Sequence, residues 1–307
     1  MKNVTAFSPG HITGFFEVFD GSDDPLRVGS RGAGVSLIQG VRTVVKVSSN
    51  IRNSVRIRIN GKHTGSAEVS HQVLDLALRH NRDMKNAALV IEHSVEVPIG
   101  AGLGTSGASA LSLALALNEA LGLGMSELEA SKVAHIAEIR CKTGLGTVIA
   151  ESCGGLEIRT KPGAPGIGEV RQVPLPEEYL VVAFVLGPMP TKEVLSNDES
   201  RSGINKFGGE LVDDFSREPN AESFMEFSRR FAECVGLITP RIRKILARTD
   251  RDGFVCSMPM FGESVFTLIK PDRVRDLVKS LQANASKGQL IISGIDFEGA
   301  RLVGRQL

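Results

Sequence analysis

The chain has 307 residues, a length that accommodates one large domain or two domains of ordinary size. Its apolar content of 42% and its charged content of 23% are typical of a soluble globular protein with a sizeable core. The net charge of +1 and the aromatic content of 5%, without any Trp, argue against a nucleic acid or an anionic membrane as partner.

The cysteines and the chain start indicate a cytoplasmic protein. Four cysteines are scattered without a C-x-x-C pair, so neither a zinc site nor a disulfide framework is predicted. The first residues, MKNVTAFSPG, lack the apolar core of a signal peptide. The most apolar run, residues 108–123, is too short and too often interrupted by polar residues for a membrane span.

The N-terminal third is predicted to be mainly β-structure. Alternation of Val55, Ile57 and Ile59 with basic residues predicts a strand with one exposed face. In chain order, we expect a strand at 4–7 that ends at Ser8-Pro9-Gly10, a strand or helix start at 15–19, a turn at 29–34, a strand at 35–48, a strand at 55–59, a helix at 69–80 and a strand at 87–97.

The middle of the chain is predicted to be helical. Residues 106–121 are apolar nearly all round, so this helix should be buried. Ser126 and Glu129 form a capping box that begins a second helix, which runs to about residue 142. A helical stretch at 147–152 and a strand at 156–160 follow.

The glycine- and proline-rich loop 161–170 is the best candidate for a domain boundary, which divides the chain into residues 1–170 and 171–307. Strand and helix blocks alternate unevenly, which favours an α+β fold over a doubly wound sheet. Beyond the loop we expect a strand at 179–186, helices around 193–215 and 221–248, a hairpin-like segment at 253–269, a helix at 271–283 and strands at 290–293 and 300–303.

The stretch 97–117, VPIGAGLGTSGASALSLALAL, has a glycine-rich loop ahead of an apolar segment. Residues 102–107 match G-x-G-x-x-G, but Glu127 and Glu129 at the required distance lie at a helix start, which disfavours a dinucleotide site. No lysine follows the glycines, so a Walker A loop is excluded. Two interpretations remain: a phosphate cradle of another kind, or glycines that only let a buried helix pack tightly.

A helix that begins at Thr105-Ser106 favours the phosphate cradle. Backbone N–H groups and the positive end of the helix dipole converge there. The hydroxyl of Ser106 can complete a Mg²⁺ coordination sphere.

The segment PIGAGLGTSGA resembles the P-x-x-x-G-L-G-S-S-A loop of the GHMP kinases, the superfamily of galactokinase, homoserine kinase and mevalonate kinase. AFSPGHITGFF resembles the first motif of these proteins, and a degenerate third motif with Gly262 falls within 257–269. The resemblance implies a two-domain fold, with an N-terminal domain like domain 2 of ribosomal protein S5 and a ferredoxin-like C-terminal domain. It implies ATP with its phosphates on Pro98, Gly100, Ala101, Gly102, Leu103, Gly104, Thr105, Ser106 and Gly107.

Within that superfamily the chain is similar to the archaeal pantoate kinases. The segments that carry this are SPGHITGFF, GSRGAG, H-x-x-E at 135–138, KTGLG, GGLEIR, GPMPTKEVL and SGIDFEGARLV, in order along the chain. The resemblance implies transfer of the ATP γ-phosphate to the terminal hydroxyl of pantoate, which gives 4-phosphopantoate, a step toward coenzyme A. It also implies a homodimer, and substrate contacts at Ser30, Arg31, His135, Arg159 and Thr191.

The same resemblance places Mg²⁺ between Ser106 and Glu138. His135 and Glu138 are spaced i, i+3 and share one helix face, so both can point into one cleft. The residue types alone leave alternatives open. Arg159 suits a surface strand, His135 suits a core edge with a carbonyl partner, and Glu138 suits an exposed pair with Lys142.

One position departs from the family pattern. Several GHMP kinases carry an Asp, the proposed general base, seven residues before the G-G that follows the second helix, and here that position is Thr147. A threonine cannot accept the substrate proton at neutral pH. Either transfer runs through positioning and electrostatics alone, as homoserine kinase suggests, or the chain is a catalytically weak regulatory relative.

The main hypothesis is therefore an ATP- and Mg²⁺-dependent pantoate kinase with Ser106, Glu138 and Thr147 at its catalytic centre. The retained Ser106, Glu138 and Arg159 favour an active enzyme. The alternatives are another small-molecule GHMP kinase of the homoserine or mevalonate type, and a ligand-binding regulatory protein on the same fold.

Overall fold

The computed structural model describes residues 2–49, 54–65, 67–79, 87–175, 178–189, 198–283 and 287–304. The strands are β1 (Lys2–Phe19), β2 (Gly29–Ser49), β3 (Ser54–Ile59), β4 (Lys62–His63), β5 (Ala87–Val95), β6 (Leu156–Lys161), β7 (Glu169–Gln172), β8 (Leu180–Pro188), β9 (Gly262–Ile269), β10 (Gln289–Ser293) and β11 (Arg301–Val303). The helices are α1 (Glu68–Leu78), α2 (Thr105–Leu121), α3 (Glu127–Cys141), α4 (Thr147–Cys153), α6 (Asp198–Arg217), α7 (Ala221–Cys234), α8 (Pro240–Arg251), the 3-10 helix η2 (Pro271–Arg273) and α9 (Val274–Gln282).

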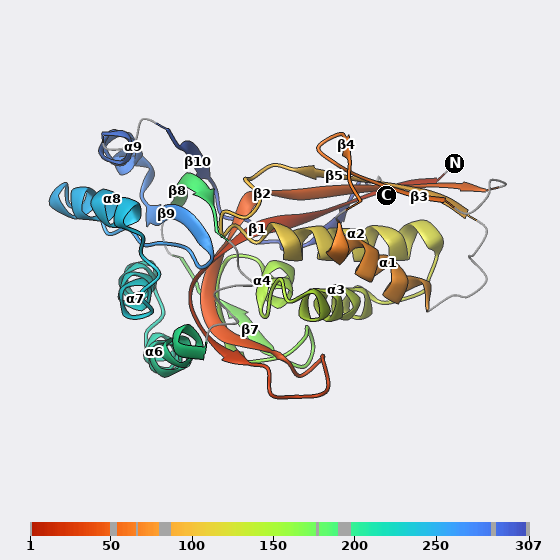
Figure 1. The fold of residues 1–307 in the computed structure, drawn as a ribbon, viewed down its shortest axis with the longest axis horizontal. Coiled ribbons are helices and arrows are strands. Elements are labelled where there is room, and N and C mark those ends of the chain that lie inside the picture. The colour runs from red at the N-terminus through yellow and green to blue at the C-terminus, as the bar shows by residue number, and fades with distance from the viewer. Residues whose placement is uncertain are drawn as a thin grey trace.

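Two sheets organise the molecule. The larger has the order β11-β1-β2-β5-β3-β4, with β6 paired to β2 and β7 paired to β6, and the smaller has the order β10-β8-β9. Figure 1 shows α1, α2 and α3 on one face of the larger sheet, and α8 and α9 beside the smaller one. The helices α6 and α7 pack mainly against β1. The α+β class expected from the sequence is confirmed. The chain division at residue 170 stays a prediction, and the last strand, β11, pairs with β1.

The two long strands β1 and β2 extend through both halves of the molecule (Figure 1). The prediction that Ser8-Pro9-Gly10 ends a strand is wrong, because β1 continues past a register shift at Pro9/Gly10 that accommodates the proline. The predicted turn at 29–34 is also wrong. These residues begin β2, and residues 32–35 of the strand pair with both β1 and β6.

The helices around the glycine loop follow the sequence closely. α2 begins at Thr105 and is buried over most of its surface, as its composition predicts. Ser126 and Glu129 form the expected capping box at the start of α3, and Lys142 ends that helix in the left-handed conformation. α4 begins at Thr147, so the predicted break between the two helices is confirmed.

The C-terminal half differs from the prediction at two points. The expected single helix 221–248 is two helices, because Gly236 has a φ of +70° and Thr239 caps α8 with Pro240 in its first turn. The expected hairpin at 253–269 contains only β9, with an isolated bridge from Ser257 to Phe266. The strands predicted at 290–293 and 300–303 are confirmed as β10 and β11.

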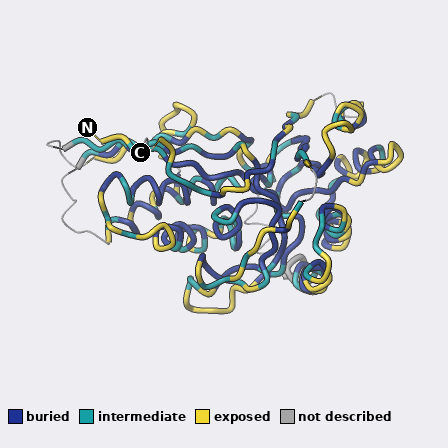
Figure 2. The backbone as a smooth tube through the Cα atoms, turned by 180° about the vertical axis from the view of Figure 1, so that it is seen from behind, coloured by how far each residue is buried: buried dark blue, intermediate teal, exposed yellow. Residues whose placement is uncertain are grey.

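Two apolar clusters form the core. One cluster lies between the helices α1, α2 and α3 and the part of the larger sheet that contains Ala6 of β1 and Val45 of β2. The other cluster lies between the part of the same two strands that contains Ile12 and Val35, and the smaller sheet with its helices. In Figure 2 the buried backbone is densest where the long strands pass between the two halves. No helix in the described part of the chain is long and apolar enough to span a bilayer.

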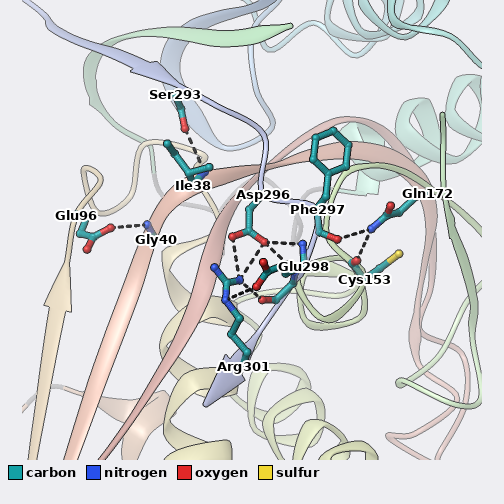
Figure 3. Close-up of polar contacts among 11 residues, drawn as sticks. Ile38, Gly40, Glu96, Cys153, Gln172, Ser293, Asp296, Phe297, Glu298 and Arg301 are labelled. Atoms are coloured by element: carbon teal, nitrogen blue, oxygen red, sulfur yellow. Dashed lines mark hydrogen bonds and ion pairs between the residues drawn. The ribbon is translucent and has the colours of Figure 1, made fainter. Parts of the chain in front are cut away.

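The segment between β10 and β11 ties the chain end to the centre of the molecule (Figure 3). Asp296 is buried and pairs with Arg301 at 2.9 Å. Its backbone oxygen accepts a hydrogen bond from Gly155 at 2.7 Å, just before β6. Gln172 donates to the carbonyl oxygens of Cys153 at 2.9 Å and Phe297 at 2.8 Å. These contacts fix the junction of α4 and β6.

Candidate active site

A cavity of about 520 Å³ opens where the half of the molecule with the larger sheet meets the half with the smaller sheet. Its walls come from β1, the glycine loop, the start of α2, the segment from the end of α3 to the start of α4, and the turn before β9. The lining residues are His11, Thr13, Phe16, Ser30, Ile99, Gly100, Gly102, Leu103, Gly104, Thr105, Ser106, Gly107, Glu138, Lys142, Thr143, Gly144, Leu145, Gly146, Thr147, Met260 and Phe261. Two non-glycine residues of this wall, Lys142 and Phe261, have positive φ angles of 54° and 62°, a cost that often marks a functional site.

The glycine loop wraps one side of the cavity in a conformation that only glycine adopts easily. Gly102 and Gly104 have φ angles of +77° and +68°. A Cβ on Gly102 would lie 2.8 Å from the backbone oxygen of Met260. The carbonyl of Leu103 accepts a hydrogen bond from the backbone N–H of His11 at 3.1 Å, which anchors the loop to β1. The backbone is therefore held close to the cavity, where its amides can meet an anion.

Ser106 and Glu138 face each other across this end of the cavity. The Ser106 hydroxyl is buried and has no hydrogen-bond partner within the described residues, although it lies near enough to Glu138 to lower the pKa of that carboxyl. Burial outweighs this effect and raises the pKa of Glu138 to about 7. Glu138 is 2% exposed, so the alternative of an exposed residue paired with Lys142 does not hold.

These two side chains suit a Mg²⁺ ion that is shared with phosphates. An unpartnered hydroxyl and a buried carboxylate are hard oxygen donors, which Mg²⁺ prefers. The described residues contain no cluster of three or more His, Cys, Asp or Glu side chains that could form an all-protein metal cage. A site of this kind leaves coordination positions for a nucleotide, as expected for a phosphoryl-transfer enzyme.

Thr147 lines the cavity at the start of α4, and a carboxyl group lies one turn further along. Glu151 is fully buried behind the glycine loop, and a Cβ on Gly104 would lie 2.7 Å from its Oε1 atom. Neither carboxyl oxygen has a hydrogen-bond partner in the described part of the chain. Burial, and next the charge of Glu138, raise the pKa of Glu151 well above its usual range. The surroundings of Glu151 thus favour its protonated form, and the side chain does not line the cavity wall.

Replacement of Glu151 by glutamine tests whether the buried carboxyl is protonated. A raised folded-state pKa means that Glu151 supports folding fully below its unfolded pKa and loses this support as pH rises through the folded value. We expect Glu151→Gln to raise the melting temperature at pH 8 by at least about 2 °C, which corresponds to about 1 kcal/mol, and to change little at pH 4. Thermal unfolding of both proteins across this pH range measures the effect, and a gain that is equal at both pH values would contradict it.

A buried ionic network joins β1 to β6 next to the cavity. His11 Nε2 lies 3.0 Å from Glu157 Oε1, and Arg159 donates to the same oxygen from Nη1 at 2.6 Å. Arg159 is 1% exposed, which rules out the alternative of a surface strand residue. It does not line the cavity. Gly146 covers it, and its Nε has no partner in the described residues.

The other predicted substrate residues lie in different surroundings. Ser30 is on the cavity wall. Arg31 points away from it and pairs with Glu17 at 2.8 Å and Asp213 at 2.9 Å. His135 shares Nε2 with the carbonyl oxygens of Pro25 and Val28, the kind of contact that its structural alternative anticipates. Thr191 lies outside the described residues.

The predicted phosphate-binding loop is largely together on the wall, except that Pro98 and Ala101 line a neighbouring hollow beside β8. No role was predicted for Met260 and Phe261, or for His11 and Thr13, which occur only within the quoted SPGHITGFF motif. Lys142 was named only as a possible partner of Glu138. His11 had a usable signal, because it directly follows the Pro-Gly of the first motif.

Comparison with known proteins agrees with this geometry. The family model of the GHMP kinases N terminal domain matches residues 70–155. The chain is 34% identical to the pantoate kinase of Methanocaldococcus jannaschii over 279 residues, which cover 90% of this chain and 96% of that protein. It is 34% identical to the pantoate kinase of Thermococcus kodakarensis over 274 residues, 88% of each chain. A solved phosphotransferase related to the CoA biosynthesis pathway has a TM-score of 0.89 at 29% identity and covers 100% of both chains.

Proposed function

The chain belongs to the GHMP kinases, in the group of the pantoate kinases, and we propose that it transfers the γ-phosphoryl group of ATP to the terminal hydroxyl of pantoate. The products are ADP and 4-phosphopantoate. The cavity between the two halves is the proposed active site, and Mg²⁺ is the proposed metal. We also propose a homodimer, a division of the chain near residue 170, and a cytoplasmic location in keeping with the four free cysteines.

The observation that carries this proposal is the unpartnered Ser106 hydroxyl beside the buried Glu138, at the end of a loop whose glycines adopt positive φ. A buried hydroxyl without a partner costs about 1–3 kcal/mol of stability. A bound nucleotide and its metal would satisfy this group. The cost is therefore explained by a ligand better than by tight packing of α2 alone.

In the proposed mechanism, phosphoryl transfer depends on positioning and electrostatics. The amides of the glycine loop and of the first turn of α2 bind the phosphates and orient the γ-phosphorus. Ser106 and Glu138 would hold Mg²⁺, and the bound ion would supply positive charge to offset the charge that develops on the phosphate oxygens. Met260 and Phe261 line the cavity next to the glycine loop. Thr147 contributes a hydroxyl to this wall but no base.

The acceptor is a small hydroxy acid, and its carboxylate requires a cationic or hydrogen-bonding site. Ser30 is on the wall, and the Arg159 Nε lies just beneath it, covered by Gly146. Gly146 belongs to the KTGLG loop, which joins two helices and carries no side chain over the guanidinium. We propose that the carboxylate of pantoate binds over this loop, within reach of Ser30 and the charge of Arg159.

We expect Arg159→Gln to raise the KM for pantoate by about 10-fold or more and to leave the KM for ATP within about twofold. A charge-assisted hydrogen bond contributes about 1.5–3 kcal/mol. Steady-state kinetics with each substrate varied in turn gives both constants. An equal rise in both KM values would assign Arg159 to the support of Glu157 alone.

An acceptor panel tests the function itself. Coupled ADP release is measured with pantoate, homoserine, mevalonate and galactose at equal concentrations. We expect turnover with pantoate to exceed that with each other acceptor by at least about 100-fold in kcat/KM. Turnover with only homoserine or only mevalonate would mean that this compound, and not pantoate, is the acceptor. Nucleotide binding without any turnover would favour a regulatory relative, the alternative that Thr147 supports.

A further inference from the structure

The cavity contains few groups that can take a proton from an acceptor hydroxyl. In the described part of its wall the titratable side chains are His11, Glu138 and Lys142. Glu138 faces the Ser106 hydroxyl and is the proposed metal ligand, and Lys142 is a cation. Glu151 holds its own proton behind the glycine loop, and Thr147 is not a base. This leaves His11.

His11 is fixed at the junction of the proposed nucleotide and acceptor sites. Its backbone N–H donates to Leu103 of the glycine loop, so the ring moves with that loop. Its Cα is on β1, and its ring packs flat over β2, where a Cβ on Gly34 would lie 2.3 Å from Nε2 and Cε1. Only glycine at position 34 leaves room for the imidazole. The ring is 1% exposed and cannot rotate freely.

The contacts of the ring define its tautomer. Glu157 has one oxygen 3.0 Å from Nε2, and the same carboxylate oxygen accepts a hydrogen bond from Arg159 at 2.6 Å. A carboxylate accepts and cannot donate, so Nε2 carries the proton of the neutral ring. The lone pair is therefore on Nδ1. This nitrogen lies 3.4 Å from the hydroxyl of Thr13, which also lines the cavity.

We propose that His11 is the general base of the reaction, and that the Thr13 hydroxyl relays the proton to its Nδ1 atom. The inference rests on the proposed function, since it requires an alcohol as acceptor. Glu157 fixes the ring and stabilises the imidazolium that forms, and Arg159 holds Glu157 in place. His11 thus supplies the function that the absent Asp at position 147 would have.

Each bond that forms in the proposed transfer is matched by a bond that breaks. The acceptor hydroxyl gives its proton to the Thr13 oxygen as Thr13 gives its own proton to Nδ1 of His11. The electron pair of the acceptor oxygen forms the new O–P bond. The bond between the γ-phosphorus and the bridging oxygen breaks, and its electron pair leaves with ADP. The imidazolium later returns its proton to water.

The surroundings of the His11 ring favour its neutral form. Burial lowers the pKa of His11, the hydrogen bond and the charge of Glu157 oppose this effect, and Arg159 adds to it. Glu151 lies close to the same loop, and Glu138 and Lys142 are the other titratable residues that line the described cavity wall. A ring that is neutral at pH 7 is ready to accept a proton.

The test compares His11→Asn with a matched control, His93→Asn, at saturating ATP and pantoate. His93 is also buried and hydrogen-bonded, to Thr43 and Ser70, but it does not line the cavity. We expect His11→Asn to lower kcat by at least about 100-fold and to bind ATP within about twofold of the wild type. His93→Asn should keep kcat within about threefold. A His11→Asn protein that keeps kcat within about threefold overturns the proposal.

The pH profile of kcat separates a base from a structural residue. The wild-type profile should fall on the acid side, and the His11→Asn profile should lose that fall. A limb that shifts with the Mg²⁺ concentration belongs to Glu138, and a limb that does not shift belongs to His11. If His11→Asn lowers kcat but keeps the Mg²⁺-independent limb, the base is another group.

A second pair of variants keeps His11 in place. Thr13→Val removes the relaying hydroxyl at nearly constant volume, whereas Thr13→Ser keeps it. We expect kcat to fall by at least about tenfold in Thr13→Val and to stay within about threefold in Thr13→Ser. Equal kcat values in the two variants overturn the relay. Wild-type turnover with no tested alcohol would instead refute the proposed function, so the two failures are distinguishable.

Discussion

Glu138→Gln should lower kcat by about 100-fold or more and leave the protein as stable as before, or more stable. The substitution keeps the shape of the side chain but removes the anionic metal ligand beside Ser106. Loss of one electrostatic contact to a transferring group typically costs 10²–10³-fold in rate, that is about 2.7–4 kcal/mol. Steady-state ADP release as a function of Mg²⁺ concentration measures the effect.

The expected effect of Glu138→Gln on stability is opposite to its effect on rate. Burial raises the pKa of Glu138 to about 7, so the wild-type protein loses folding free energy as pH rises through 7, and glutamine removes this loss. We therefore expect a melting temperature at pH 8 that is equal or higher. Glu127→Gln, on the exposed start of the same helix, is the control and should change neither quantity. Full activity in Glu138→Gln would remove Glu138 from the metal site.

Gly104→Ala should lower kcat/KM for ATP by about 100-fold. The residue has a φ of +68°, which costs an alanine about 1–2 kcal/mol, and its new Cβ would lie 2.7 Å from Glu151 Oε1 and 2.9 Å from the backbone nitrogen of His11. The loop must shift to relieve these contacts. A displacement of about 1 Å at a reacting centre costs about 10²-fold in rate.

The other end of α2 offers a matched control. Gly122 also has a positive φ, of +61°, but a Cβ there would meet open space. Gly122→Ala should therefore cost stability alone, with nucleotide affinity unchanged. Calorimetric titration with a non-hydrolysable ATP analogue compares the two variants. Equal affinities would mean that the loop conformation does not determine nucleotide binding.

The local signals in the sequence were sufficient for the loop and the helices around it. The glycine spacing, the capping box of Ser126 and the Thr-Gly-Leu-Gly break after α3 are encoded within a few residues, so their positions are predictable. The extent of the long strands β1 and β2 was not predictable in this way. Gly29–Gly34 has the composition of a turn, and only pairing with β1 and β6 makes it a strand.

The network beside the cavity was hidden for the same reason. His11 is far in the sequence from Glu157 and Arg159, and the three side chains meet because Gly32 and Gly34 on the strand between β1 and β6 leave room for them. Arg159 was predicted as a substrate contact and lies beneath the wall, whereas His11 was quoted only within a motif. Strand register determines such contacts, and composition does not report it.

The buried groups of the site divide the chemistry among separate positions. In the proposed function, Ser106 and Glu138 hold the metal, the glycine loop binds the phosphates, and His11, Glu157 and Arg159 lie between the two proposed substrate sites. Glu151 stays neutral behind the loop, which avoids a second negative charge next to the nucleotide. The proposed enzyme is active despite Thr147 because His11 accepts the proton of the acceptor hydroxyl.

The most direct test of the central claim identifies the product. The protein is incubated with ATP, Mg²⁺ and pantoate, and the ³¹P spectrum is recorded with proton coupling. Phosphorylation of the terminal hydroxyl predicts a new phosphomonoester signal split into a triplet by the neighbouring methylene, in an amount equal to the ADP formed. A doublet, which reports the other hydroxyl of pantoate, or ADP formation that does not depend on pantoate would contradict the account.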